Sequence, residues 1–283
     1  MTPRAAAPAV RPFDRERNAM SRRLEARTAI IFGAGSVGPG WGNGKATAVT
    51  FARAGAHVVC VDAVAAAAAE TVAIITAEGG SAEAAACDVL DSDRVKALVD
   101  GIAAARGRID ILHNNVGYAQ MGGPIELTEA DWHRAIDLNV TSCFITCKHV
   151  LPHMLKQGAG SITNVSSVAA IRWVGYPYVA YYAAKAAVNN FTQGLALQYA
   201  QDGIRVNAIM PGLMNTPLIF QQISGQYADP AEMVRARDAA CPMGRMGTAW
   251  DIANAALFLN SDEAAYITGI SLAVDGGLTA RAA

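Results

Sequence analysis

The sequence carries few charged and few aromatic side chains, and its positive and negative charges nearly cancel. Of its 283 residues, 17% are charged and 7% are aromatic, and the formal net charge is −1. Without a positive excess there is no electrostatic reason to bind nucleic acid or an anionic membrane surface. No uninterrupted apolar run reaches the ~18 residues from which a membrane-spanning helix is built. We therefore expect neither nucleic acid nor a membrane among the partners.

Cysteine is also scarce. The five cysteines are odd in number and irregularly spaced, which indicates reduced thiols and a cytoplasmic protein rather than a disulfide framework. Cys143 and Cys147 are four residues apart, but no nearby Cys or His completes a metal site with them, so no metal is expected. Hydrophobic residues make up 52% of the chain, which is enough for a large core.

The first 22 residues differ from the rest of the chain. They are rich in Ala, Pro and Arg, show no periodicity, and lack the apolar core of a signal peptide. We predict a disordered extension over residues 1–22. No linker or repeat divides residues 23–283, so we predict one domain there, with a substrate loop at about 213–247.

Short apolar segments alternate with longer segments of helical periodicity. This alternation is typical of an α/β fold with a parallel sheet and helices on both faces. We predict a doubly wound, seven-stranded Rossmann fold, in which ligands bind at the carboxyl ends of the strands. The predicted strands are 28–32, 57–62, 82–87, 109–115, 161–167, 204–212 and 270–274, and the predicted helices are 44–54, 65–77, 92–106, 129–156, 179–201 and 250–260, with 213–247 irregular.

A glycine-rich loop follows the first predicted strand. Residues 33–46 read GAGSVGPGWGNGKA and hold six glycines. Glycine lets a backbone turn sharply and bring its N–H groups close to an anion, and the N-terminus of the next helix adds partial positive charge. The loop therefore indicates a site for the pyrophosphate of a dinucleotide.

The glycines of this loop are spread more widely than in most dinucleotide-binding loops. If residues 37–41 are an insertion, the pyrophosphate lies against the flanking residues, which are Gly33, Gly35, Gly42, Asn43 and Gly44. Pro39 and Trp41 then project as a flap, and Trp41 covers an apolar edge of the cofactor or packs on a neighbouring loop. In the rival register, Gly38 and Gly40 make the contacts. The sequence leaves both registers open.

Asp62 ends the second predicted strand. A carboxylate at this place accepts hydrogen bonds from the hydroxyls of an adenosine ribose and repels a 2′-phosphate. No Arg or Lys follows it in residues 63–65. Asp62 therefore favours NAD over NADP as the cofactor.

A Ser, a Tyr and a Lys lie at the end of the fifth predicted strand and in the helix after it. Ser167 ends that strand, and Tyr181 and Lys185 share one face of the next helix. A free tyrosine has a pKa near 10, and lowering it by about three units needs roughly 4 kcal/mol, which an adjacent ammonium and a cationic nicotinamide can supply. These residues indicate acid–base chemistry on a carbonyl or hydroxyl oxygen.

From about residue 25 to residue 277, the chain resembles the short-chain dehydrogenase/reductase family in its compact single-domain form. The features that carry the resemblance, beyond the glycine loop, are Asp88–Val89, NNVG at 114–117, Asn139, Ser167, Tyr181 with Lys185, Pro211–Gly212 with Thr216, and VDGG at 274–277.

The resemblance implies a role for each matching residue. Tyr181 would be the general acid/base, Lys185 would lower its pKa and bind the nicotinamide ribose, Ser167 would orient the substrate oxygen, and Asn139 would hold a water in a proton relay. It implies adenine contacts from Asp88 and Val89, cofactor-side positions at Asn115, Gly117, Pro211 and Gly212, and a carboxamide contact from Thr216. Asp62 marks NAD preference in this family.

The chain also departs from the family pattern. The spacing from Ser167 to Tyr181 is one longer than the usual thirteen, and Ser166 competes for the role of Ser167. Tyr182 stands beside Tyr181 but lacks the spacing to the lysine. Phe32 replaces a common Thr, and we interpret His113 as a packing or hydrogen-bonding residue.

Segments 168–180 and 213–245 are predicted to wall the substrate pocket, and their apolar and aromatic residues favour an uncharged, hydrophobic secondary alcohol or ketone, cyclic and aromatic ones included. Arg172 is interpreted as facing solvent. Enoyl reduction, epimerisation and a non-enzymatic dinucleotide sensor remain alternatives, although the complete Ser–Tyr–Lys–Asn set favours carbonyl chemistry. The resemblance implies a homotetramer, and segment 179–201 has more apolar positions than one buried stripe needs.

Overall fold

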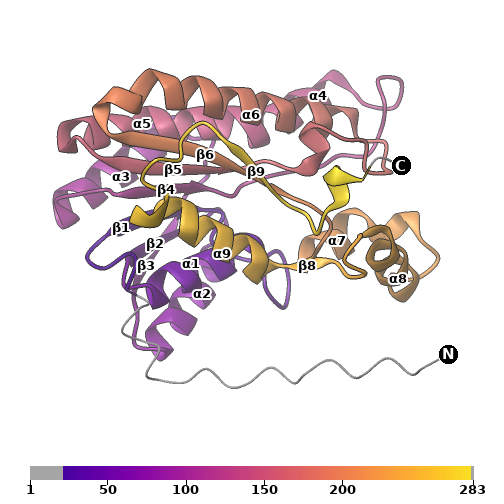
Figure 1. Cartoon of the computed structure of the whole chain (residues 1–283), viewed down its shortest axis with the longest axis horizontal. Coiled ribbons are helices and arrows are strands. Elements are labelled where there is room, and N and C mark those ends of the chain that lie inside the picture. The colour runs from indigo at the N-terminus through magenta and orange to yellow at the C-terminus, as the bar shows by residue number, and fades with distance from the viewer. Residues whose placement is uncertain (1–21, 282–283) are drawn as a thin grey trace.

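A sheet of seven parallel strands runs through the middle of the molecule (Figure 1). The structure is a computed structural model that describes residues 22–281, so the extension predicted at 1–22 lies, except for Arg22, outside the described residues. The strands are β1 (Thr28–Phe32), β2 (His57–Asp62), β3 (Ser81–Ala86), β4 (Ile111–Asn114), β5 (Gly160–Val165), β6 (Ile204–Pro211) and β9 (Ser271–Val274).

The strands follow the order β3-β2-β1-β4-β5-β6-β9, and each neighbouring pair is parallel. β1 pairs with β2 on one side and with β4 on the other, so the chain is wound outward in both directions from this point. The predicted doubly wound α/β fold is confirmed. In such a sheet the crevice at the reversal of strand order is the usual ligand site.

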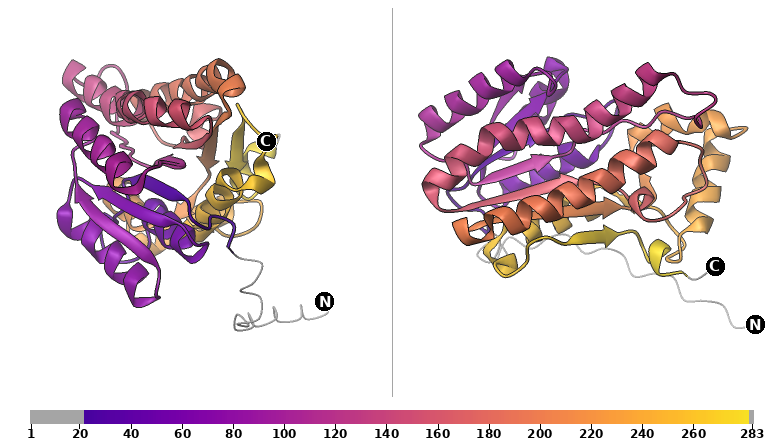
Figure 2. Two further views of the ribbon diagram at one scale, coloured as in Figure 1. Left: turned by 90° about the vertical axis from the view of Figure 1, so that its left-hand side faces the viewer. Right: turned by 90° about the horizontal axis from the view of Figure 1, so that it is seen from above.

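Helices cover both faces of the sheet (Figure 2). One face carries α1 (Asn43–Arg53), α2 (Ala65–Ala77) and α9 (Ala249–Asn260), and the other carries α3 (Ser92–Arg106), α4 (Glu129–Ile136), α5 (Ser142–Gln157) and α6 (Val179–Tyr199). Within residues 22–281, every helix is too short or too polar to span a membrane.

β1 shows why these segments form a buried parallel sheet. All five of its residues are buried. Ile31 packs into one hydrophobic cluster with Phe51 of α1, whereas Ile30 and Phe32 pack into the cluster on the other face with Val150 of α5. A strand covered on both faces needs apolar side chains at successive positions, and the sequence TAIIF supplies them.

The segment predicted as one helix over residues 129–156 is divided. A π-helical turn, Asp137–Thr141, separates α4 from α5. Within it the side chain of Asn139 donates to the carbonyl of Ala135, which occupies an acceptor that an α-helical N–H would otherwise use (Nδ2–O 2.8 Å). Such turns are frequent at functional sites, and this one aims Asn139 into the protein.

The prediction of an irregular segment at 213–247 was wrong in part. It contains α7 (Pro217–Gln222) and α8 (Pro230–Ala240), and the short strands β7 (Met214–Asn215) and β8 (Gly247–Thr248) pair with each other. Both helices begin with proline, and Asp229 caps α8 through the N–H of Glu232 (2.7 Å). Asp-Pro before a helical segment is a start signal that was available in the sequence.

Candidate active site

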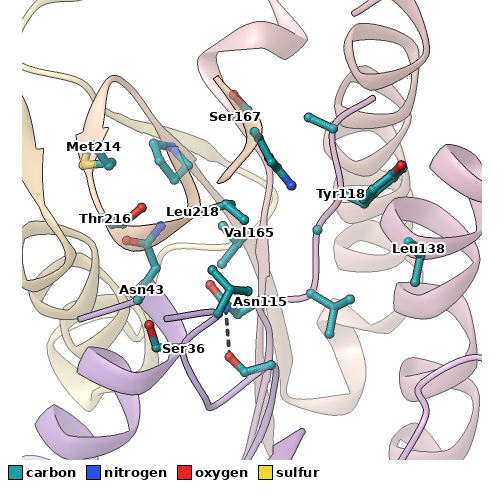
Figure 3. A pocket seen from close by; sticks show the side chains of 18 of the residues that line it. Ser36, Asn43, Asn115, Tyr118, Leu138, Val165, Ser167, Met214, Thr216 and Leu218 are labelled. Atoms are coloured by element: carbon teal, nitrogen blue, oxygen red, sulfur yellow. Dashed lines mark hydrogen bonds between the residues drawn. The ribbon is translucent and has the colours of Figure 1, made fainter. Parts of the chain in front are cut away.

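A cavity of about 490 Å³ lies at the carboxyl ends of the strands. Residues that follow β1, β2, β4, β5 and β6 line it, and α7 and α8 close its far side. Figure 3 shows side chains from these segments converging on the cavity, among them Asn43, Asn115, Ser167 and Thr216. The cavity occupies the place that the doubly wound topology predicts.

At both ends of the glycine loop, the backbone lies so close to neighbouring residues that a side chain would not fit. Gly33 has φ +79° and a Cβ there would lie 3.1 Å from the N of Val116. A Cβ at Gly35 would lie 2.5 Å from the Cβ of Ala67 in α2, and one at Gly44 would overlap the carbonyl oxygen of Gly33. Side chains at these positions would push α1 and α2 away from β1.

Residues 38–41 in the middle of the loop lie away from the cavity, although Val37 lines it. Gly38 and Gly40 lie beside Pro217 of α7, and Nε2 of Gln221 donates to the carbonyl of Val37 (2.6 Å). Gly33, Gly35, Gly42 and Asn43 line the cavity, whereas Gly38 and Gly40 are not among the lining residues. This arrangement agrees with the register in which residues 37–41 are an insertion.

Trp41 packs against the protein instead of the cavity. Its ring lies 4.6 Å from the ring of Trp250 in α9, and Nζ of Lys45 lies 5.2 Å from its centroid. Lys45 also pairs with Glu70 of α2 (2.6 Å). Of the two alternatives for Trp41, the structure shows packing on a neighbouring element, and the tryptophan anchors the insertion to α9.

Asp62 is held by two backbone donors at the edge of the cavity. Its Oδ2 accepts from the N–H of Gly35 and its Oδ1 from the N–H of Val64 (both 3.0 Å). The carboxylate therefore has a fixed orientation beside the glycine loop. Arginine and lysine are absent from the residues that line the cavity around it, apart from Lys185 and Arg237 on the far side.

The other predicted cofactor positions also line the cavity. Nδ2 of Asn115 donates to the carbonyl of Gly33, a bond drawn as the dashed line in Figure 3 (2.9 Å). A Cβ at Gly212 would lie 2.6 Å from the Cα of Asp275, so this residue must be small. The remaining predicted positions that line it are Asp88, Val89, Gly117, Pro211 and Thr216. Gly44 is the one predicted position that is packed behind the loop.

The two neighbouring serines have different surroundings. Oγ of Ser166 is buried and donates to the backbone carbonyl of Lys185 (3.0 Å), so it joins β5 to α6. Oγ of Ser167 accepts from the N–H of Ala169 (3.1 Å) and keeps its proton available to the cavity. Of the two serines, this geometry favours Ser167 for the contact with a substrate oxygen.

Tyr181 and Lys185 meet at the base of the cavity. Nζ of Lys185 lies 5.5 Å from the centroid of the Tyr181 ring and donates to the carbonyl of Val165 (2.9 Å). Burial lowers the pKa of Lys185 to about 8. Burial also raises the pKa of Tyr181, and the nearby Ser167 hydroxyl acts in the opposite direction. In the protein alone the phenol is therefore neutral at pH 7.

Asn139 and Gly117 complete this group. Nδ2 of Asn139 donates to the carbonyl of Tyr118 (2.7 Å), and its Oδ1 accepts from the N–H of the same residue (3.3 Å). A Cβ at Gly117 would lie 3.2 Å from Nζ of Lys185 and 3.3 Å from Oδ1 of Asn139. The absence of a side chain at Gly117 thus lets the lysine and the asparagine lie on either side of this backbone. The structure brings together the four residues predicted as catalytic.

Aromatic rings form the substrate side of the cavity. The ring of Tyr178 packs edge-on against Tyr181 (5.2 Å) and stacks on Tyr176 (5.8 Å). Arg172 is exposed and donates to the carbonyl of Ile171, which agrees with its interpretation as a solvent-facing residue. Apolar and aromatic residues of the two predicted wall segments line the cavity, among them Tyr178, Leu213, Met214, Leu218 and Ile219.

Sequence reasoning missed several lining residues, of which Arg237 is the most important. It lies in α8, is 4% exposed, and lines the cavity. Arg237 falls four residues after Met233, and the two side chains are buried on one face of α8, but only the packing of that helix reveals this burial. Tyr118 and Leu138 were missed because the loop after β4 and the π-helical turn place them, and neither feature has a local sequence pattern.

Buried groups outside this site are structural. Nδ1 of His113 is hydrogen-bonded to Oγ1 of Thr163 (3.2 Å). Burial lowers the pKa of His113 to about 3, so the imidazole is neutral and the residue packs in the core as interpreted. All five cysteines are buried and unpaired. Over residues 22–281, no three His, Cys, Asp or Glu side chains are grouped to bind a metal.

The fold and this arrangement of residues define a nicotinamide-dependent oxidoreductase with one Rossmann-type sheet. The family model described as enoyl-(acyl carrier protein) reductase matches residues 39–279. A structure of a short-chain dehydrogenase/reductase from Burkholderia xenovorans is 46% identical, with a TM-score of 0.89, over 92% of this chain and 99% of that chain. The chain belongs to the short-chain dehydrogenase/reductase family.

Two further relatives have stated activities. The cis-4-hydroxycyclohexanecarboxylate dehydrogenase of Sinomonas cyclohexanicum is 40% identical over 92% of this chain and its own full length. A 7α-hydroxysteroid dehydrogenase, solved with NADH and 7-oxo glycochenodeoxycholic acid, is 36% identical with a TM-score of 0.82, over 92% of this chain and 96% of that chain. Dehydrogenation of hydroxyl compounds is thus shared among close relatives.

Proposed function

We propose that this enzyme interconverts a hydrophobic secondary alcohol and its ketone with NAD as cofactor. The observation that carries the proposal is the convergence of Ser167, Tyr181 and Lys185 on the cavity where the strand order reverses, with Asn139 buried beside them across Gly117. Relatives that oxidise ring hydroxyls support a cyclic substrate. The apolar lining from Leu213 to Ile219 supports a hydrophobic one.

The cavity fits a dinucleotide. Oδ1 of Asn43 is buried, faces the cavity, and has no hydrogen-bond partner within the described part of the chain, so a bound hydroxyl or amide would satisfy it. Gly33, Gly35 and Gly42 leave the main chain bare beside the N-terminus of α1, where an anion is favoured. NAD rather than NADP is supported by Asp62, whose fixed carboxylate accepts from ribose hydroxyls and repels a 2′-phosphate.

The chain's own residues would orient the alcohol and move its proton. Bound NAD supplies the acceptor for the hydrogen that leaves the carbinol carbon with its electron pair. The Ser167 hydroxyl would hold the substrate oxygen, and the Tyr181 phenolate would take the hydroxyl proton. Because burial raises the pKa of Tyr181, the positive charges of Lys185 and of the oxidised nicotinamide are needed to favour the phenolate.

Asn139 would assist the transfer of the same proton away from Tyr181. Its side chain is fully buried and fixed on the backbone of Tyr118, directly across Gly117 from the ammonium of Lys185. We propose that this amide positions a water through which the proton of Tyr181 passes to Lys185 and on to solvent. Ser167 and Tyr181 would touch the substrate, whereas Asn139 acts through the water and is a positioning residue.

A second candidate is enoyl reduction, which is the activity by which the matching family model is described. The complete set of Ser167, Tyr181, Lys185 and Asn139, together with the dehydrogenase activities of the relatives, favours carbonyl chemistry instead. The same set argues against epimerisation, and a dinucleotide sensor would be expected to have lost Tyr181 or Lys185, both of which are present.

We also propose a cytoplasmic homotetramer. α5 and α6 lie side by side on one face of the molecule (Figure 2). Each of the two helices exposes a large apolar side chain. Phe144 is 53% exposed and Leu197 is 73% exposed. Pairing of these helices with a second copy would cover such a surface.

The test of the proposed function is a panel of secondary alcohols, ketones and enoyl compounds with NAD(H) and NADP(H), followed by nicotinamide absorbance. We expect oxidation of a cyclic or aromatic secondary alcohol, with kcat/KM at least about tenfold higher with NAD than with NADP, a difference of about 1.4 kcal/mol. Equal use of the two cofactors would contradict the role of Asp62. Reduction of enoyl compounds without carbonyl reduction would establish the second candidate.

A further inference from the structure

Arg237 is a buried cation that faces the substrate side of the cavity. Its guanidinium has five N–H donors, and the structure accounts for two of them. Nη1 donates to the phenol oxygen of Tyr176 (2.9 Å) and Nε to the sulfur of Met246 (3.3 Å). Neither acceptor carries charge, and a thioether is a weak acceptor.

No carboxylate compensates this charge. Within residues 22–281, no carboxylate oxygen lies within 4.0 Å of a guanidinium nitrogen of Arg237, which is the distance limit for an ion pair. The carboxylate of the adjacent Asp238 accepts instead from the N–H of Met246 (2.7 Å). Arginine is almost never buried without a partner, because removing its charge from water costs several kcal/mol.

Arg205 shows how this fold satisfies a structural arginine. Its guanidinium donates to the backbone carbonyls of Leu259, Ile267 and Ser261, at 2.7 to 3.2 Å. Those carbonyls fix the side chain between α9 and β9. Arg237 has no such set of acceptors, and it lines a cavity whereas Arg205 does not. The remaining donors of Arg237 are therefore available to a ligand.

The position of Arg237 indicates which end of a bound substrate it would contact. Tyr176 accepts its hydrogen bond, stacks on Tyr178, and bonds to the hydroxyl of Tyr227 (2.7 Å). Tyr178 in turn packs edge-on against Tyr181. A row of aromatic rings thus separates the guanidinium from the proposed acid/base, on the wall opposite the glycine loop.

We propose that Arg237 binds a carboxylate of the substrate, at the end remote from the reacting hydroxyl. This inference rests on the proposed function and narrows it: the substrate is a hydroxy acid with a hydrophobic, cyclic or aromatic body. It replaces the expectation of an uncharged substrate, which was based on the apolar and aromatic residues of the wall segments and on Arg172 facing solvent. The planar fork of Arg237 suits a carboxylate held by two parallel hydrogen bonds, and the tyrosine rings contact the body between the two ends.

The wild-type enzyme gives the first test. The full chain is assayed with NAD and matched pairs of hydroxy acid and hydroxy amide, beginning with cis-4-hydroxycyclohexanecarboxylate and its carboxamide. We expect kcat/KM for the acid to exceed that for the amide at least about tenfold, mainly through KM. A ratio near one in every pair that is turned over would overturn the proposal without touching the proposed function.

Variants locate the effect. Arg237→Gln is expected to lower the acid-to-amide ratio about tenfold or more, and Arg237→Lys to retain part of it. Arg235→Gln is the matched control, because Arg235 lies on the same helix but is exposed, and its ratio should equal that of the wild type. Binding of NAD should be unchanged in Arg237→Gln. A weakened NAD complex with an unchanged ratio would mean that the anion is the cofactor's pyrophosphate, and would overturn the proposal.

A binding measurement separates the two proposals if no compound is turned over. Titration calorimetry with cyclohexanecarboxylate and with cyclohexanecarboxamide needs no reaction. Selective binding of the acid to the wild type, lost in Arg237→Gln, would support the carboxylate site even though the proposed function had failed. Equal binding of acid and amide would overturn it.

Discussion

The ammonium of Lys185 lies 5.5 Å from the centre of the Tyr181 ring and donates its hydrogen bond to the carbonyl of Val165 instead of to the phenol. We therefore expect the lysine to act on the tyrosine through its charge, at a distance. Since burial has lowered the pKa of Lys185 to about 8, that charge is itself close to being lost in the cofactor-free protein.

This pKa predicts how stability depends on pH. Between about pH 8 and the ordinary lysine pKa of 10.5, the unfolded chain holds the Lys185 proton and the folded protein does not. The unfolded state then binds more protons, so the contribution of Lys185 to the free energy of unfolding rises with pH across this window. Urea unfolding of the wild type and Lys185→Met at pH 7, 8, 9 and 10 measures it. The wild type should gain stability relative to the variant above pH 8, and a constant difference would contradict the lowered pKa.

Asp62 is predicted to select the cofactor. Asp62→Ala removes the acceptor for ribose hydroxyls and the repulsion of a 2′-phosphate. We expect the Kd for NAD to rise about tenfold or more, while NADP binding weakens less or improves. Because Asp62 also holds the N–H groups of Gly35 and Val64, the readout is the ratio of the two Kd values and not either one alone.

The matched control for this variant is Asp93→Asn, an exposed carboxylate near the start of α3. Its ratio of Kd values should be that of the wild type. An Asp62→Ala protein that rejects NADP as strongly as the wild type does would show that another residue excludes the phosphate.

The register of the glycine loop makes opposite predictions for two glycines. Gly44→Ala forces a Cβ into the carbonyl of Gly33 and should destabilise the protein and weaken NAD binding. Gly38→Ala adds a Cβ whose nearest neighbour is Pro217 at 3.7 Å, so it should be tolerated. Thermal unfolding with and without NAD measures both. Loss of NAD binding in Gly38→Ala, with Gly44→Ala unaffected, would establish the rival register.

The proposed tetramer depends on the exposed apolar face of α5 and α6. Light scattering at micromolar concentration should give the mass of four chains. Leu197→Glu places a charge on this face and should reduce the assembly, whereas Gln198→Glu, next to it and also exposed, should not do so to the same extent. A monomeric wild type at that concentration would rule the tetramer out.

The sequence was sufficient to predict the seven strands and the doubly wound fold, because apolar runs and glycine loops are local signals. The end of each predicted strand located the groups that line the cavity, such as Asp62 and Ser167. The π-helical turn around Asn139 and the helices at 217–222 and 230–240 were not predicted, since the first depends on a side chain taking over a backbone acceptor.

The charge of the substrate pocket could not be read from the sequence for a different reason. Arg172 and Arg237 are the same residue type in the two predicted wall segments, and only packing distinguishes them. The side chain of Arg172 is exposed at the surface. The side chain of Arg237 points inward and contacts Tyr176, because α8 packs over the cavity. Burial of one side chain on a short helix is a tertiary property.

The central claim is that the phenol of Tyr181 transfers the proton, and the most direct measurement is kcat of Tyr181→Phe beside that of Tyr182→Phe. Tyr182 is a stringent control, because its hydroxyl has a structural role: it accepts from the N–H of Val174 (3.0 Å) and donates to the carbonyl of Tyr176 (3.1 Å). We predict a loss of about 100-fold or more in kcat for Tyr181→Phe with NAD binding nearly intact, and a far smaller loss for Tyr182→Phe. Near-wild-type turnover by Tyr181→Phe would contradict the account.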